Sequence, residues 1–258
     1  MQATITKPIH SGARAIMSAT VTPTRVRDVL RRSPVAVSER VSASTVDAAD
    51  RSRQYLELRT CIDQAVGALF LIVAAPLLLA IAALVRLTSS GPVIYTQVRS
   101  GRDGLPFVIY KFRSMTVDAE RHTGAAWSGM HDPRVTRIGA WLRWSHLDEL
   151  PQLFNIARGD MTLIGPRPER PEIVAKLIAQ IPGYEKRLAM APGLTGLAQV
   201  SLPADTGLSS VRRKLILDVQ YLQSASLAMD VHILLCTGLL VFGVRRALEP
   251  RFWVELDN

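Results

Sequence analysis

Residues 64–85, QAVGALFLIVAAPLLLAIAALV, carry no charged side chain and constrain the fold more than any other segment. At about 1.5 Å per residue, a straight helix of this length approaches the thickness of a bilayer's hydrocarbon core. Pro76 lies near the middle of the run, where it removes a helical hydrogen bond and kinks the rod. The segment therefore predicts two helical halves joined at a break.

Positive charge flanks both ends of this run, with Arg51, Arg53 and Arg59 before it and Arg86 after it, alongside Asp63. Because Lys and Arg are retained on the cytoplasmic side, both ends are expected there, and the segment dips into one leaflet as a re-entrant helix. A single membrane-spanning helix and a buried helix of a soluble protein are the two alternatives.

The chain divides into three predicted parts. Residues 1–50 have no sustained apolar period, which is typical of a disordered tail. Residues 51–88 form the membrane-associated segment with its basic flanks, and residues 89–258 form a compact, mostly helical cytoplasmic domain with amphipathic interfacial helices. The predicted fold class is therefore α+β, as a monotopic membrane protein with a small β-hairpin.

The hairpin is predicted over Val93–Phe112, where two β-rich runs flank the turn cluster GRDG. Helices are predicted within TRIGAWLRWSHL, within the proline-bounded segment PEIVAKLIAQ, and over Ser210–Gln223. The run Val231–Val244 is too short to span a bilayer and favours an interfacial or core helix. The segment APGLTGLAQV is predicted to be a glycine-rich loop.

The stretch SHLDELPQLFNIARGD places two adjacent carboxylates before a helix. Pro151 is tolerated only in a helix's first turn, so we expect Asp148 at the N-cap, Glu149 as the first helical residue and Gly159 at the end. A helix N-terminus would also keep the Asp148 carboxylate ionised and attract phosphoryl groups. A capping role alone is the plain alternative for Asp148.

Composition narrows the class of partner. The net charge is +9 while hydrophobic residues make up 48% of the chain, which favours anionic lipid or phosphorylated substrates. An aromatic share of 6%, without a basic helix interleaved with aromatic residues, argues against nucleic acid as a partner. Cys61 and Cys236 lie far apart, which argues against a disulfide framework or zinc site and for a reducing compartment.

Basic side chains are concentrated between the two apolar segments, and several stand in the rigid loops GPRPE, DPRVTRIG and KFRSM. A bidentate guanidinium held by such a loop suits phosphate oxygens, although any single member could belong to a solvated face. The candidates are Arg99, Lys111, Arg113, Arg134, Arg137, Arg143, Arg158 and Arg167.

Two adjacent carboxylates on a helix point about 100° apart and cannot share one role. A division of labour follows, in which one carboxylate attacks phosphorus and the other holds Mg²⁺.

The runs GPVIYTQVRSGRDGLPFVIYKFRSM, DPRVTRIGAWLRWSHLDELPQLFNIARGDMTLIGPRPE and PGLTGLAQV closely resemble the bacterial sugar transferase family. Its members are monotopic polyprenyl-phosphate hexose-1-phosphate transferases, also called phosphoglycosyl transferases. The resemblance covers roughly Arg59–Thr237 and implies transfer of a sugar-1-phosphate from a UDP-sugar to undecaprenyl phosphate, with release of UMP. It also implies a place at the bacterial inner membrane, with the catalytic domain on the cytoplasmic face, in exopolysaccharide, O-antigen or glycoconjugate synthesis.

The resemblance assigns roles to particular residues. It implies that Asp148 forms a covalent phosphosugar intermediate, that Glu149 binds Mg²⁺ and that Arg143 contacts phosphate. Pro166, Arg167 and Pro168 would shape the nucleotide site. Further substrate-site candidates are Asp218, Tyr221 and Gln199, although Asp218 and Tyr221 could instead be a simple helix-surface pair.

Three departures from the family's pattern stand in the chain. SLPADTGLSS replaces an Asn-Gly-Arg type loop, and a tryptophan before the last helix is missing. Where larger members carry a multi-span N-terminal membrane domain, this chain has a polar tail, so it is expected to resemble the family's short catalytic form. A glycosyltransferase that moves the sugar alone and a lipid-bound scaffold of polysaccharide assembly are the alternative functions. A homodimer is one oligomeric state left open.

Overall fold

Two helices, α2 (Ala43–Val73) and α3 (Ala75–Thr88), form the apolar arm of the protein. The computed structural model describes residues 43–117, 119, 132–203 and 207–241, and the chain bends by 61° between these two helices. Pro76 lies in the first turn of α3, where a helix tolerates proline, and its missing N–H could not have continued the hydrogen bonding of α2. The predicted proline break is confirmed.

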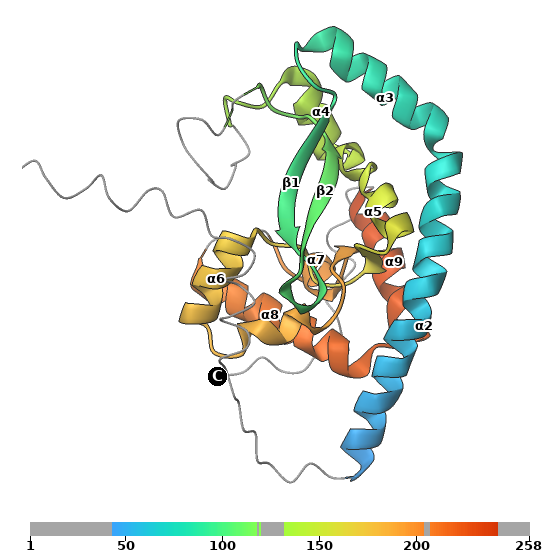
Figure 1. The fold of residues 1–258 in the computed structure, drawn as a ribbon, viewed down its shortest axis with the longest axis vertical. Helices are drawn as coiled ribbons and strands as arrows, with labels where there is room; N and C mark the ends of the chain where they lie inside the picture. Colours follow the sequence, from blue (N-terminus) through green and yellow to red (C-terminus); the bar gives the residue numbers. More distant parts are fainter. Residues whose placement is uncertain (1–42, 118, 120–131, 204–206, 242–258) are drawn as a thin grey trace, which may run out of the picture.

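Within the described residues, only this bent pair has the length and apolar composition to cross a membrane, and no single helix does. Figure 1 shows α2 running along one side of the molecule and α3 bending over the end that holds α4 (Arg137–Trp144). Residues 43–50 of the predicted tail are helical, and the rest of that tail lies outside the described residues.

The predicted hairpin is confirmed. Strand β1 (Ile94–Ser100) pairs antiparallel with β2 (Pro106–Phe112), from Ile94 opposite Phe112 to Ser100 opposite Pro106. The predicted turn is the short 3₁₀ segment η1 (Arg102–Gly104). In Figure 1 the hairpin stands in the middle of the molecule, beside α4 and α5 (Gln152–Arg158).

A second, two-stranded parallel sheet was not predicted. It joins β3 (Thr162–Ile164) to β4 (Gly193–Thr195), and β4 lies in the segment predicted to be a loop. The two chains approach so closely that a Cβ at Gly193 would lie 2.0 Å from the backbone nitrogen of Gly165. Only glycine fits there, which explains the glycine content of this segment.

The remaining elements surround these two sheets. The predicted helices are confirmed, each with ends shifted by a few residues. They are α4, α6 (Pro171–Gln180), α8 (Leu208–Ser224) and α9 (Leu227–Val241), with the short elements η2 (Leu147–Glu149), η3 (Tyr184–Ala189) and α7 (Leu197–Ser201) between them. The described structure is thus α+β and mostly helical, as expected.

Each of the two helices of the apolar arm packs into a different hydrophobic cluster. Ile164 of β3, Tyr221 of α8 and Ile233 of α9 pack against Leu56 of α2 in one cluster. Val85 of α3 packs in another cluster with residues of β2 and α4. Because these apolar side chains of α2 and α3 are buried against the domain, the two helices are fixed to it and do not form an independent arm.

Large apolar side chains remain exposed along the other face of the arm and along α9. The largest exposed fractions on these helices are those of Leu87, Ile72, Leu79, Val73, Leu227, Leu58 and Leu235. Such a surface exceeds the scattered apolar residues of an ordinary soluble domain.

Candidate active site

The two adjacent carboxylates lie in η2, between α4 and α5. The prediction that Asp148 caps α5 is wrong, because α5 begins at Gln152 and Pro151 occupies its N-cap position. A tighter turn, in which Leu150 N donates to the carbonyl of Leu147 at 3.3 Å, precedes the helix. The end at Gly159 is confirmed, with a left-handed φ of 84°.

His146 precedes this turn with a φ of 57°, in the left-handed region that non-glycine residues rarely adopt. The conformation reverses the chain after α4 and directs the next residues inward, so that Asp148 is buried. Strained backbone of this kind concentrates at functional sites, because the surrounding structure must hold it in place.

The Glu149 carboxylate binds two cationic side chains that come from distant parts of the chain. Lys111 Nζ donates to its Oε1 at 2.6 Å, and Arg167 Nη2 donates to the same oxygen at 2.7 Å. Burial opposes ionisation of the Glu149 carboxyl, but the charges and hydrogen bonds of Arg167 and Lys111 outweigh it and lower the pKa. Glu149 is therefore held as a carboxylate.

The pKa of Asp148 is shifted in the opposite direction from that of Glu149. Burial is the largest influence and raises the pKa of its carboxyl, and the neighbouring charge of Glu149 raises it further, while Lys111 and Arg143 oppose the shift. The expectation that a helix N-terminus keeps Asp148 ionised is thus not met, since this residue does not cap a helix. The adjacent carboxylates differ in environment, as a division of labour requires.

Three predicted basic residues gather around the pair. Lys111 and Arg167 bind Glu149 directly, and burial lowers the pKa of the Lys111 amine. Arg143 donates from Nε to Ser114 Oγ at 2.8 Å and is close enough for its charge to stabilise ionised Asp148. Arg167 is half exposed, which leaves it accessible to a ligand from solvent.

Other predicted phosphate ligands have different partners. Arg113 is buried and donates to the carbonyl and hydroxyl of Ser89 at 2.8 and 2.7 Å, at the C-terminus of α3. There it offsets the negative end of the helix dipole. Arg137 is exposed on the first turn of α4. Arg134 and Arg158 each pair with an aspartate two residues away in the chain, Asp132 and Asp160.

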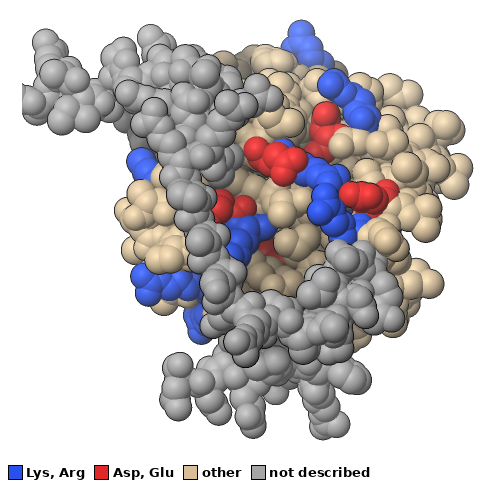
Figure 2. Space-filling view, turned by 60° about the horizontal axis from the view of Figure 1, so that its bottom comes forward, with Lys and Arg blue, Asp and Glu red and all other residues tan. Residues whose placement is uncertain are grey.

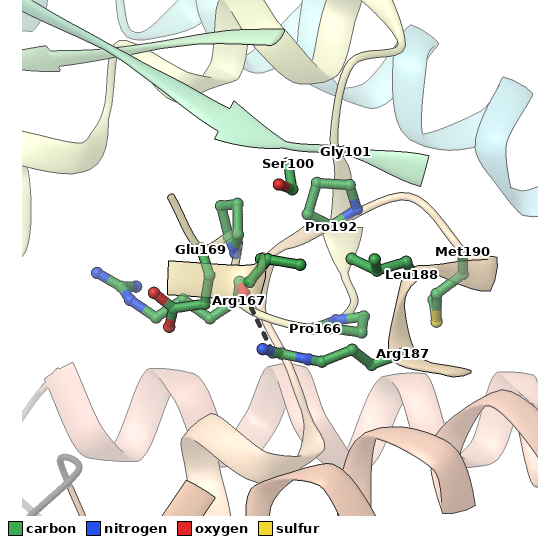
Figure 3. Close-up of a pocket in the computed structure, with 11 residues that line it drawn as sticks. Ser100, Gly101, Pro166, Arg167, Glu169, Arg187, Leu188, Met190 and Pro192 are labelled. Atoms are coloured by element: carbon green, nitrogen blue, oxygen red, sulfur yellow. Dashed lines mark hydrogen bonds between the residues drawn. The ribbon is translucent and has the colours of Figure 1, made fainter. Parts of the chain in front are cut away.

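The Pro166-Arg167-Pro168 segment lines a small pocket against the end of β1 and the loop before β4 (Figure 3). Arg99 supports this segment by donating to the carbonyl of Pro168 at 3.0 Å. Arg187 of η3 supports it from the other side, donating to the carbonyl of Arg167 at 3.1 Å, the dashed line in Figure 3.

Arg187 was missed in the sequence, because its contacts with Arg167 and Asp218 join distant parts of the chain and no local spacing reveals them. Its guanidinium also pairs with Asp218 of α8 at 2.8 Å, and both side chains are buried. Burial raises the pKa of the Asp218 carboxyl, and Arg187 opposes this. A helix-surface role for Asp218 is therefore wrong.

A second cleft opens beside this pair. The cleft is open to solvent, and its polar lining includes Arg167, Glu169, Arg187, Gln199, Lys214 and Asp218. The Nε2 atom of Gln199 is buried there with no hydrogen-bond partner in the described structure. Gln199 and Asp218, two predicted substrate-site candidates, thus meet at one cleft that also contains Arg167.

Tyr221 lies elsewhere, although it shares helix α8 with Asp218. Its hydroxyl donates to Asp230 and accepts from Arg59 in the interior between α2 and α9. One helical turn therefore separates a residue of the cleft from a residue of the core.

Acidic and basic side chains are interleaved on the face that Figure 2 displays, instead of forming a uniformly basic surface. Interleaved charges hold one another in fixed positions, which favours recognition of a small charged ligand over adsorption to a polyanion.

Asp148 and Glu149 supply few oxygen ligands for a magnesium ion. The described residues hold no group of three or more His, Cys, Asp and Glu side chains that could enclose a metal. Both cations contact Oε1 of Glu149, however, so Oε2 remains the oxygen that a metal would take. Mg²⁺ characteristically binds one or two carboxylates and completes its shell with substrate phosphates and water. The adjacent carboxylates fit that pattern.

A family model described as "Bacterial sugar transferase" matches residues 54–244. The chain belongs to the bacterial sugar transferase family. The resemblance expected from the sequence is therefore confirmed, and the matched residues include the apolar arm from residue 54 onward, η2, and the residues that line the small pocket and the cleft.

Several relatives in this family have names that state a reaction. The chain is 47% identical, over 54% of its length and 77% of the relative's, to a Bacillus subtilis protein provisionally named an undecaprenyl-phosphate N-acetylgalactosaminyl 1-phosphate transferase. It is 42% identical, over 68% of its length and 66% of the relative's, to a Caulobacter vibrioides UDP-glucose:undecaprenyl-phosphate glucose-1-phosphate transferase. It is 40% identical, over 65% of its length and 86% of the relative's, to a Rhizobium leguminosarum exopolysaccharide production protein.

Other relatives are much longer. The chain spans 41% of the Aeromonas hydrophila UDP-N-acetylgalactosamine-undecaprenyl-phosphate N-acetylgalactosaminephosphotransferase and 38% of a Klebsiella pneumoniae glucose-1-phosphate transferase. The named sugars also differ among these relatives, so the family assignment alone does not choose one.

Proposed function

We propose that the protein transfers a sugar-1-phosphate from a UDP-sugar to undecaprenyl phosphate and releases UMP. The observation that carries the proposal is the asymmetric carboxylate pair, in which Glu149 is held ionised by two cations while Asp148 is buried beside it. The names of the family relatives, several of which are undecaprenyl-phosphate sugar-phosphate transferases, support the same reaction.

In the first proposed step, a carboxylate oxygen of Asp148 attacks the β-phosphorus of the UDP-sugar. The bond from that phosphorus to the bridging oxygen breaks, its electron pair leaves with UMP, and the sugar-phosphate becomes an acyl phosphate on Asp148. In the second step, a phosphate oxygen of the lipid attacks the same phosphorus. The Asp148 carboxylate leaves, and the product is a lipid diphosphate that carries the sugar.

The surrounding cations have separate uses in this scheme. Arg143 is placed to stabilise the ionised form of Asp148 that attacks. Arg167, half exposed and directed at Glu149, is placed to bind the diphosphate of the incoming nucleotide. We propose that the cleft containing Gln199 and Asp218 accepts the rest of the nucleotide, because it adjoins Arg167.

Glu149 would hold Mg²⁺ through Oε2, and the ion would supply positive charge to neutralise the diphosphate. Lys111 would then keep Oε1 fixed, which orients the carboxylate toward the substrate.

We also propose that the protein is monotopic at the cytoplasmic face of the bacterial inner membrane. The exposed apolar side chains of the arm and of α9 support this location, because both would be costly in water and a lipid phosphate must be reached. Anionic lipid would attract the net positive charge of the chain.

The test uses the purified full chain in lipid nanodiscs with a panel of UDP-sugars and undecaprenyl phosphate. We expect UMP release that requires the lipid for continued turnover, and one dominant sugar. Release of UDP would instead establish transfer of the sugar alone. Absence of any nucleotide release across the panel would favour a scaffold and overturn the proposal.

A further inference from the structure

Two buried side chains of α2, Arg59 and Asp63, hold strand β3 by its backbone. Arg59 Nη2 donates to the carbonyl of Ile164 at 2.5 Å, and the amide of Leu163 donates to Asp63 Oδ2 at 3.0 Å. The same Asp63 oxygen lies 3.3 Å from Arg59 Nε. One turn of α2 thus binds two backbone groups of β3 at adjacent residues, the N–H of Leu163 and the carbonyl of Ile164.

A second carboxylate fixes this contact from the opposite side. Asp230 of α9 lies 3.2 Å from Arg59 Nη1, and it accepts hydrogen bonds from the hydroxyls of Tyr55 and Tyr221. All three charged groups are buried. A buried ionic cluster carries a desolvation cost that stability alone seldom repays, so its geometry calls for a further role.

Strand β3 leads directly into the loop that carries Arg167. Beyond Ile164, Gly165 N donates to the carbonyl of Thr195 at 2.8 Å, and Gly193 N donates to the carbonyl of Pro166 at 3.0 Å. The backbone between the α2 contact and Arg167 is therefore fixed at each step. Arg167 then donates to Glu149 at 2.7 Å.

We propose that Arg59 and Asp63 are positioning residues that set the place of Arg167, and through it the orientation of Glu149, from the apolar arm. The chain of contacts runs from α2 to β3, along the loop, and into the carboxylate pair. How α2 is seated against the domain therefore determines the geometry of the reacting groups. The predicted effect on turnover rests on the function proposed above, whereas the effect on the loop does not.

The variants are Arg59→Lys, which keeps the charge but cannot reach three acceptors at once, and Asp63→Asn, which keeps the size but removes the charge. The matched control is Arg53→Lys on the same helix. Arg53 pairs with Glu57 at 3.6 Å with the same four-residue spacing, but that pair is exposed. All variants are made in the full chain and studied in nanodiscs.

The first measurement is hydrogen exchange of the peptide covering residues 162–169. We expect faster exchange in Arg59→Lys and Asp63→Asn than in the wild type and in Arg53→Lys, with the exchange of α6 unchanged. Unaltered exchange in the two buried variants would overturn the proposal, even if the protein had no transferase activity.

The second measurement is a double-mutant cycle on turnover with Arg167→Lys. We expect Asp63→Asn to lower kcat by about tenfold per folded enzyme in the wild-type background, and by less than about twofold when Arg167 is already replaced. Two effects that multiply, or a normal kcat with a lowered Tm, would show a merely structural role. An inactive wild type would sink the proposed function but leave the exchange result to decide this inference.

Discussion

Arg167 and Glu149 stand eighteen residues apart in the chain, and their side chains are joined by a hydrogen bond of 2.7 Å. Lys111 completes the arrangement from the hairpin, at 2.6 Å from the same oxygen. Two other segments of the chain thus converge on the Glu149 carboxylate. The adjacent Asp148 is buried instead, and burial raises the pKa of its carboxyl. Most of the testable consequences follow from this asymmetry.

Replacement of Asp148 by asparagine tests the nucleophile. Asparagine has nearly the same shape but cannot form an acyl phosphate, so Asp148→Asn should lower turnover by about three orders of magnitude or more. Because Asp148 caps no helix and its ionised form is disfavoured by burial, Tm should stay the same or rise slightly. Mass spectrometry after incubation with UDP-sugar alone should find a phosphosugar on the Asp148 peptide of the wild type. Kinetics that require both substrates bound together, without an adduct, would point to direct transfer.

Replacement of Glu149 by glutamine tests the ion cluster. Glu149→Gln leaves the partly buried Lys111 amine without its anion, so it should destabilise the protein by about 1–3 kcal/mol as well as reduce turnover. Denaturant unfolding in nanodiscs measures the first effect. Lys111→Met with Glu149→Gln is the control, because removing both charges should restore part of the lost stability.

Metal dependence has its own measurement. If Glu149 binds Mg²⁺, excess chelator should abolish UMP release, and added Mg²⁺ should restore it without refolding. Full turnover in excess chelator would remove the metal role from Glu149 and leave charge neutralisation to Arg167 and Lys111.

The pH dependence of turnover should be bell-shaped. The nucleophile must be ionised, so turnover should rise with pH through a pKa above the ordinary value of 3.8 for an aspartate. It should fall again as Lys111 loses its proton below the ordinary lysine value of 10.5. Because the folded pKa of Asp148 is raised, its contribution to stability is present at low pH and lost as pH rises through that pKa. Tm of Asp148→Asn should lack this component.

The membrane arrangement predicts a labelling pattern. If the bent arm enters and leaves one leaflet, cysteines placed at Arg53 and Thr88 should both resist a membrane-impermeant reagent in intact cells. Both should react after permeabilisation. Reaction of the Arg53 site alone in intact cells would establish a spanning helix.

Gly193 tests the close contact between β3 and β4. A methyl group there would meet the backbone nitrogen of Gly165 at 2.0 Å, so Gly193→Ala should destabilise the fold by about 1–3 kcal/mol or more. It should also reduce turnover by displacing the loop before Arg167. Gly207→Ala is the matched control, since nothing lies within 4 Å of an added Cβ at that position.

Local features of the sequence determined much of this protein. The uncharged run with Pro76 predicted the broken helix pair, the GRDG cluster predicted the hairpin turn, and Gly159 predicted a helix end. Each depends on backbone chemistry within a few residues, which a sequence displays directly. The ordered motifs likewise indicated the family and the carboxylate pair at Asp148 and Glu149.

Tertiary structure decided how charges are paired. Arg59 was counted as a positive flank of the apolar run, yet it is buried against Asp63 and Asp230. Asp218 and Tyr221 share helix α8, but Asp218 lines the cleft and Tyr221 lies in the interior between α2 and α9. Coulombic interaction and burial depend on distance in space, and charged partners such as Arg59 and Asp230, 171 residues apart, have no signature in local spacing. The sequence by itself therefore determined which chemical groups are present, and only the packed structure decided which of them act together.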